Sequence, residues 1–108
     1  MIWDVNYTND AQQDLQDIYD YISLILLEPG IAAKQTDRIM DAADSLNHMP
    51  FRYRLYEYDP WRSKGLRILP VDNYLIFYLP DKSKNTVTII RIMYGSRDVD
   101  KHLYTVDK

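Results

Sequence analysis

The spacing of the apolar residues changes twice along this chain, and that change limits its fold more than any other feature. Residues 2–7 (IWDVNY) alternate between apolar and polar side chains, which is typical of a half-buried β-strand. From residue 11 the apolar residues recur at helical spacing, until Pro29 and Gly30, which are predicted to end the helix. The opposite side of this helix, predicted to face solvent, carries three aspartates: Asp14, Asp17 and Asp20.

A second amphipathic helix is predicted from residue 32 to residue 46, so the two helices form an antiparallel hairpin. The apolar pattern then changes to that of strands, with three candidates at residues 66–71, 74–79 and 86–94. Short polar connections separate these strands, which predicts an antiparallel meander.

The expected fold is therefore a single α+β domain over residues 1–108, in the order β-α-α-β-β-β with a short C-terminal tail. The helical hairpin is expected to cover one face of a small antiparallel sheet and to leave the other face open. Strict alternation along the last strand predicts two sets of side chains, Ile90, Ile92 and Tyr94 on one face and Ile89, Arg91 and Met93 on the other.

Composition argues against several kinds of chemistry. The chain has no cysteine, only three glycines and two widely separated histidines, and it lacks nucleotide-binding and G-x-S-x-G patterns. We therefore expect no metal and no cofactor. The N-terminus has neither a basic region nor a long apolar run, so a cytoplasmic location without membrane contact is expected.

Charge is divided unevenly between the two halves. Residues 1–50 hold nine acidic and two basic side chains, a balance of −7, whereas residues 51–108 hold seven acidic and eleven basic side chains, a balance of +4. This asymmetry suggests an anionic partner for the basic half. The alternative is two solvated faces of opposite sign.

The segment 51–67 interleaves basic residues with tyrosines and a tryptophan. Basic side chains contact phosphates and aromatic rings stack on unpaired bases, so this composition suits single-stranded RNA. Four residues are predicted to contact nucleic acid: Arg52, Arg54, Arg62 and Arg91. The alternatives are that the loop aromatics seal the edge of a core under arginine stems, and that Arg91 pairs with a carboxylate.

An anion clamp is predicted at the mouth of the sheet, where Gly95 ends the last strand. Arg97 would turn onto the open face near Arg67, and two guanidinium groups there would hold a phosphate. The alternative is that Arg97 pairs locally with Asp98 or Asp100.

The chain resembles a RelE/ParE-type toxin of bacterial type II toxin–antitoxin systems over nearly its whole length. The opening strand IWDVNYT before a long helix carries part of the resemblance, and the run LRILPVDNYLIFYLPDKSKNTVTIIRIMYGSRD carries the rest. The resemblance implies the same β-α-α-β-β-β fold, a role in plasmid stabilisation, and neutralisation by a cognate antitoxin that wraps the toxin. RelE-like members cleave mRNA on the ribosome, whereas ParE-like members poison DNA gyrase.

The resemblance also assigns residues. Arg97 matches an active-site arginine of RelE-like members, but Leu75 stands where a second one is expected, and Tyr104 lies one position from a contributing tyrosine. The favoured expectation is a metal-free, ribosome-dependent endoribonuclease, with four catalytic residues: Arg97, Arg67, Tyr94 and Lys64. Proton transfer would fall to Tyr94, Lys64, Glu57 or His102. The alternative is a ParE-like gyrase inhibitor that acts by binding only, which Leu75 favours.

Overall fold

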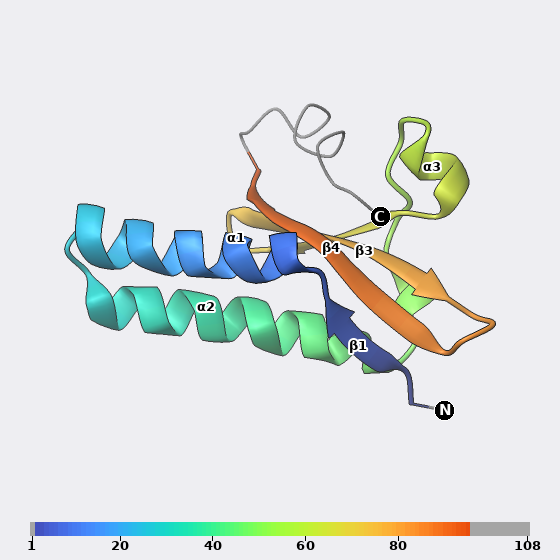
Figure 1. The fold of residues 1–108 in the computed structure, drawn as a ribbon, viewed down its shortest axis with the longest axis horizontal. Helices are drawn as coiled ribbons and strands as arrows, with labels where there is room; N and C mark the ends of the chain where they lie inside the picture. The colour runs from blue at the N-terminus through green and yellow to red at the C-terminus, as the bar shows by residue number, and fades with distance from the viewer. Residues whose placement is uncertain (1, 96–108) are drawn as a thin grey trace.

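The computed structural model describes residues 2–95 (Figure 1). The elements follow in this order: β1 (Asp4–Tyr7), α1 (Asn9–Asp20), the π-helical turn η1 (Tyr21–Ile25), α2 (Pro29–Asp44), the 3₁₀ turns η2 (Ser45–Asn47) and η3 (Pro50–Arg52), α3 (Trp61–Lys64), β2 (Arg67–Val71), β3 (Tyr74–Asp81) and β4 (Thr86–Tyr94). The predicted order β-α-α-β-β-β is confirmed, and the only addition to it is the short helical turns. No helix in this part of the chain is both long and apolar enough to cross a membrane.

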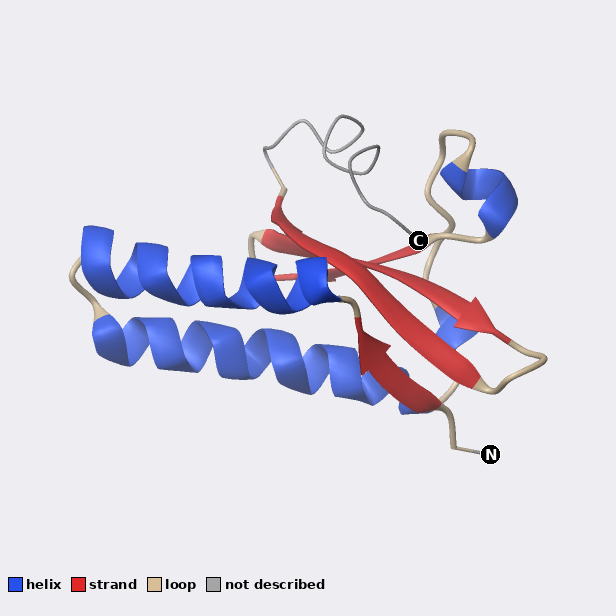
Figure 2. Cartoon of the chain, viewed as in Figure 1, coloured by secondary structure: helices blue, strands red, loops and turns tan. Residues whose placement is uncertain are grey.

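The four strands form one sheet in the order β1-β4-β3-β2 (Figure 2). Strands β2, β3 and β4 pair antiparallel, which confirms the predicted meander. Strand β1 joins β4 in parallel, from Asp4 beside Thr86 to Tyr7 beside Ile89, so the complete sheet is mixed. The first strand is short, and among residues 2–95 no strand pairs with that edge of β4 beyond Ile89.

The hairpin begins and ends on residues suited to helix ends. Thr8 caps α1, because its hydroxyl accepts a hydrogen bond of 3.0 Å from the backbone N–H of Ala11. Pro29 is the first residue of α2, so the prediction that it ends α1 is wrong. Proline suits this position because the N–H of the first helical residue has no partner within the helix. The chain reverses before it, at Leu27, whose φ of 58° lies in the left-handed region.

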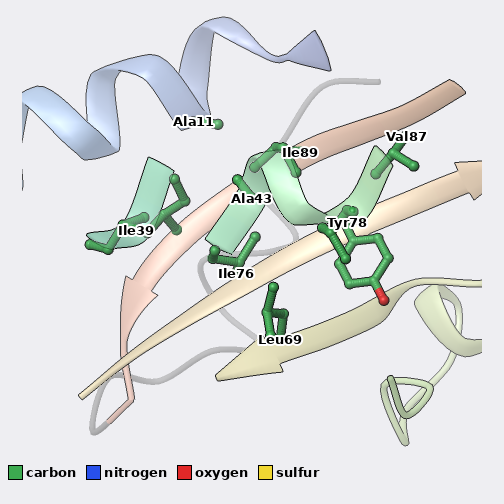
Figure 3. Close-up of a cluster of buried hydrophobic side chains, with 10 residues drawn as sticks. Ala11, Ile39, Ala43, Leu69, Ile76, Tyr78, Val87 and Ile89 are labelled. Carbon is green, nitrogen blue, oxygen red and sulfur yellow. The ribbon is translucent and has the colours of Figure 1, made fainter. Parts of the chain in front are cut away.

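The main core lies between the hairpin and the sheet. Ala11 of α1 and Ala43 of α2 are fully buried and let both helices approach the strands closely. Figure 3 shows Ala43 between Ile89 and Ile76 of the central strands, with Ala11 on the other helix above them. Tyr78 is also fully buried, and its hydroxyl donates a 2.6 Å hydrogen bond to the carbonyl of Pro50, so the buried polar atom is satisfied.

A second core covers the other face of the sheet. Its buried members are Tyr56, Trp61, Leu66, Ile68, Phe77, Ile90 and Met93. The aromatic residues of the segment before β2 supply the cover, which confirms that loop aromatics seal the edge of a core. The expectation that this face is open is wrong for this region, because an apolar surface there would face water.

A bulge in β4 explains why strict alternation fails. On β3, Phe77 pairs with Arg91 of β4, but the next residue, Tyr78, pairs with Ile89. Ile90 is therefore an extra residue in β4 that has no partner on β3. As a result Ile89 and Ile92 both belong to the core under the helices, while Ile90 belongs to the core on the opposite face. The predicted division of this strand between faces is therefore wrong.

Candidate functional site

A buried ion pair joins α1 to the uncovered edge of β4. Asp14 Oδ2 accepts hydrogen bonds from Arg91 Nε at 2.7 Å and from the backbone N–H of Ile92 at 2.9 Å, while Oδ1 accepts one from Arg91 Nη2 at 2.9 Å. The Arg91 side chain is only 12% exposed, and the Asp14 side chain is only 9% exposed. The pairing raises the pKa of Arg91, chiefly through the hydrogen bonds to Asp14.

This arrangement corrects one sequence prediction and supports another. Asp14 was expected on the solvent-facing side of the helix, but it is buried because β1 stops at Tyr7 and α1 then lies against the unpaired edge of β4. For Arg91, the commoner role of pairing with a carboxylate is confirmed. Its predicted contact with nucleic acid would require this pair to open.

Two further arginines bind backbone carbonyls within the fold. Arg67 Nη1 donates to the carbonyls of Phe51 at 3.1 Å and Tyr53 at 2.6 Å, and its guanidinium lies 5.1 Å from the centre of the Phe51 ring. Arg67 therefore fastens the chain entering the basic segment to the start of β2.

Arg52 closes the end of the helical hairpin. Its Nη1 donates to the carbonyls of His48 and Met49, and its Nη2 lies 3.5 Å from the carbonyl of Ser45. A cation at this place also interacts favourably with the negative end of the helix dipole. Both Arg52 and Arg67 thus have structural partners, although they were predicted to contact RNA or to act in catalysis.

The remaining basic residues of the segment are exposed. Arg54, Arg62 and Lys64 all lie on the surface, and Tyr58 of the same segment is also exposed. Lys64 Nζ lies 5.0 Å from the centre of the Trp61 ring, so the buried tryptophan fixes the base of this surface. These three cations are available to a partner from solvent.

Three of the predicted catalytic residues, Arg67, Tyr94 and Lys64, lie within residues 2–95, and the structure does not bring them together. Arg67 pairs with Tyr78, whereas Tyr94 pairs with Tyr74 at the far end of β3, four positions or roughly 13 Å further along the strand. Lys64 lies on α3, whose Trp61 packs on the face opposite Tyr78. A single reacting phosphate could not contact all three side chains.

Tyr94 itself is exposed and packs edge-on against Tyr74, with ring centres 5.6 Å apart. Burial raises the pKa of Tyr74, and the neighbouring Tyr94 and Tyr21 add to that rise. Three other residues from the sequence predictions, Arg97, His102 and Tyr104, lie outside the described residues. Glu57 is exposed on the basic segment, and Leu75 is half-buried in β3.

Within residues 2–95, no three His, Cys, Asp or Glu side chains gather closely enough to hold a metal ion. A shallow groove of about 200 Å³ runs between α1 and α2, and its lining residues carry no formal charge: Gln12, Leu15, Gln16, Tyr19, Thr36 and Met40. The groove therefore offers surface for contact but no charged side chain.

One exposed apolar surface was not singled out from the sequence. We call it the hairpin tip, and it comprises Tyr21, Leu24, Ile25, Leu26, Leu27 and Ile31. The helical spacing that begins at residue 11 includes Ile25 and Leu26 and predicts that both are buried, which is wrong. The signal that could have revealed the surface is the run YISLILL at residues 21–27, which has seven residues without a charge just before the turn.

Comparison with known proteins agrees with the fold. The chain is similar to the chromosomal ParDE toxin–antitoxin system from P. aeruginosa, with a TM-score of 0.70 and 23% identity over 86% of this chain and 96% of that one. It is similar to the RelBE2 toxin–antitoxin complex from Mycobacterium tuberculosis, with a TM-score of 0.62 and 22% identity over 87% and 99% of the two chains.

The toxin RelE from E. coli, in a mutant solved in the free state, matches with a TM-score of 0.62 and 10% identity over 97% of this chain and 93% of that one. A search of curated proteins gave no match. The model of the family described as the ParE toxin of the type II toxin–antitoxin system parDE matches residues 5–99. That match spans most of the chain, including every strand and both long helices, and so the chain belongs to the ParE toxin family.

Proposed function

We propose that this toxin acts by binding a protein target, DNA gyrase, and that it does not cleave RNA. The observation that carries the proposal is the internal use of the arginines. Arg52, Arg67 and Arg91 all hydrogen-bond to groups of the protein itself. A gyrase inhibitor needs a stable binding surface but no groups for acid–base catalysis. A fold in which the arginines form internal hydrogen bonds meets that requirement.

The family match supports the same choice of target. The ParE family model covers residues 5–99, and ParE-like members are the branch whose resemblance implies gyrase poisoning. Leu75, at the position where RelE-like members carry a second active-site arginine, is consistent with this branch. Gyrase acts on DNA in the cytoplasm, and we place the toxin there.

We further propose that a cognate antitoxin covers the basic segment. The similar structures from P. aeruginosa and Mycobacterium tuberculosis are described as toxin–antitoxin systems or complexes. In this chain Arg54, Arg62 and Lys64 of the basic segment are all exposed, so an acidic segment of the antitoxin would complement them and accelerate encounter. Co-expression with the neighbouring reading frame, followed by size exclusion, tests this. Separate elution of the two proteins at micromolar concentration contradicts it.

Ribosome-dependent RNA cleavage is the second candidate, and the same exposed residues favour it. Arg54, Arg62 and Lys64 beside Tyr58 combine cations with an exposed ring, as an RNA surface does. In that case Arg97 would supply the charge stabilisation, and the ribosome would complete the geometry that residues 2–95 lack.

Brief induction of the chain in cells separates the two candidates. If the toxin inhibits gyrase, plasmid DNA should lose negative supercoiling and DNA damage signalling should rise, while pulse-labelled protein synthesis continues. If translation stops within minutes and mRNA is cut inside coding regions, the binding proposal is wrong. The Arg54→Glu/Arg62→Glu variant reports on the surface, because neither side chain supports the fold.

A further inference from the structure

The hairpin tip is an apolar surface that nothing within the described chain covers. Figure 1 shows the two helices projecting well past the end of the sheet, so that the turn between them has no strand beneath it. The six side chains of the tip are between 52% and 75% exposed. Together they make a patch of several hundred Å², the size at which a surface patch on a soluble protein usually marks an interaction site.

The local backbone places these side chains outward. Where α1 passes into η1, the N–H of Leu26 bonds to the carbonyl of Tyr21 at 3.1 Å, which is the wider spacing of a π-turn. This extra residue turns Ile25 and Leu26 away from the line that buries Ile22. This π-turn ends the first helix, and the N–H of Glu28 also bonds to the carbonyl of Ile22 at 3.0 Å, with Leu27 in the left-handed position that commonly follows a helix C-terminus.

Leu27, which takes the left-handed position of this helix end, indicates that the surface has a partner. Its φ of 58° is a conformation that Gly or Asn adopts far more readily than Leu. Leu27 nevertheless occupies the turn, and its side chain is 75% exposed, so it gains almost no burial in the free chain. A leucine that is unfavourable for the turn and unburied in the fold is explained by a partner that buries it.

We propose that the hairpin tip is an interface between two copies of this chain. A two-fold interface must be complementary to itself, and an apolar surface without charge meets that condition most simply. Residues 21–27 contain no charged side chain. Six large apolar side chains, each more than half exposed, would bury several hundred Å² per copy, against the roughly 800 Å² that each partner contributes to a standard interface. Two hairpins that meet in this way pack four helices together, and each buries the tip of the other.

The charges at the border of the tip predict how this dimer responds to salt. Asp20 precedes the uncharged run and Glu28 follows it, so two tips that meet bring like charges near one another. Screening should relieve that repulsion, and dimerisation should therefore strengthen as ionic strength rises. A partner with a basic border would show the opposite salt dependence.

Sedimentation velocity of the purified chain, from low to high micromolar concentration and at two salt concentrations, tests the proposal. The expected result is a reversible shift from 12.9 kDa to twice that mass, more complete at high salt. Leu27→Asn should weaken dimerisation at least about tenfold without lowering the melting temperature, because Asn accepts the left-handed conformation.

Met49→Asn is the matched control. Met49 is 73% exposed and also left-handed, with φ of 46°, but it lies at the opposite end of α2. This variant should dimerise like the unaltered chain. A monomer at every concentration and salt overturns the proposal, as does equal weakening by both substitutions. If Leu27→Asn leaves self-association unchanged but weakens binding of the co-purified antitoxin, the tip belongs to the antitoxin and the proposal is also overturned.

Discussion

Asp14 and Arg91, 77 positions apart in the sequence, join the first helix to the last strand through two hydrogen bonds, and Asp14 accepts a third from the backbone of Ile92. The pair stands where β1 has ended and β4 would otherwise present an open edge. An open edge can pair with another chain, and a carboxylate fixed against it prevents that. The pair therefore ties α1 to the distal half of β4, as the Arg38–Asp72 pair ties α2 to the turn between β2 and β3.

Removing one partner of this pair should destabilise the protein strongly. In Asp14→Ala, the largely buried Arg91 loses its hydrogen-bonded carboxylate and the Ile92 N–H loses its acceptor, so the free energy of unfolding should fall by about 3–5 kcal/mol. The apolar double replacement Asp14→Leu/Arg91→Met should recover most of this loss. Urea denaturation measures both, and a loss in the double variant as large as in Asp14→Ala would contradict the assignment.

The pair between Arg38 and Asp72 is the matched exposed control. It has the same bidentate geometry, with both hydrogen bonds at 2.8 Å, but the Arg38 side chain is 65% exposed. The hydrogen bonds to Arg38 lower the pKa of Asp72, but solvent screens the attraction. Asp72→Ala should consequently change stability far less than Asp14→Ala in the same urea experiment.

Substitution of Arg67 and of Arg54 should distinguish an arginine that stabilises the fold from one that is exposed to a binding partner. Arg67→Ala removes charge-assisted hydrogen bonds to two backbone carbonyls, so unfolding should become easier by roughly 1.5–3 kcal/mol. Arg54→Ala, on the exposed segment, should stay within about 0.5 kcal/mol of the unaltered protein. Thermal and urea unfolding check both values. An Arg67→Ala protein of unchanged stability would return Arg67 to the candidate binding residues.

Tyr78 should make the fold sensitive to alkali. Burial raises the pKa of Tyr78 from 10.0 to about 12, although Arg67 and Arg52 oppose the rise. Between these values the folded state retains a proton that the unfolded state has released, so stability is fully present below pH 10 and declines as the pH rises toward 12. A two-unit shift corresponds to roughly 2–3 kcal/mol.

Unfolding curves measured from neutral to strongly alkaline pH test this directly. Tyr78→Phe should lose about 1 kcal/mol at neutral pH, for the hydrogen bond to Pro50, and should show a shallower alkaline decline. Tyr7, whose pKa burial and Asp44 raise to about 12, leaves a residual slope. An identical decline in both proteins would show that Tyr78 does not titrate in this range.

Arg97 distinguishes the two proposed activities by its effect on growth. RNA cleavage would depend on its guanidinium, so Arg97→Ala should abolish growth arrest and Arg97→Lys should restore only part of it, because a lysine cannot grip two oxygens. If the toxin binds gyrase, Arg97→Ala should still arrest growth. Western analysis of equal expression is the control for this comparison.

The order of the elements was predictable because each element has its own hydrophobic period. The helical hairpin and the three-stranded meander follow from local spacing and turn residues alone. What local spacing could not reveal is pairing between distant segments: the parallel contact of β1 with β4, and the burial of Asp14, which looks solvent-facing on its own helix. The bulge at Ile90 also depends on the partner strand, since it is a shift of register against β3 between Phe77 and Tyr78.

Composition alone identified the basic segment. It could not show which of its arginines stabilise the fold and which are exposed. Arg52 and Arg67 occur in the same run as Arg54 and Arg62, and only the carbonyls that surround them show which ones serve the fold. The hairpin tip was hidden for a related reason. Its apolar residues continue the buried stripe of the first helix, but the sheet ends before it reaches them (Figure 1).

The most direct measurement adds the purified toxin to DNA gyrase and, in parallel, to a cell-free translation reaction. If the toxin acts by binding gyrase, supercoiling should be inhibited in proportion to toxin concentration and restored by the co-purified antitoxin, while translation and mRNA remain intact. Uninhibited gyrase together with mRNA cut on the ribosome would contradict the binding mechanism and assign the toxin to the RNA-cleaving branch.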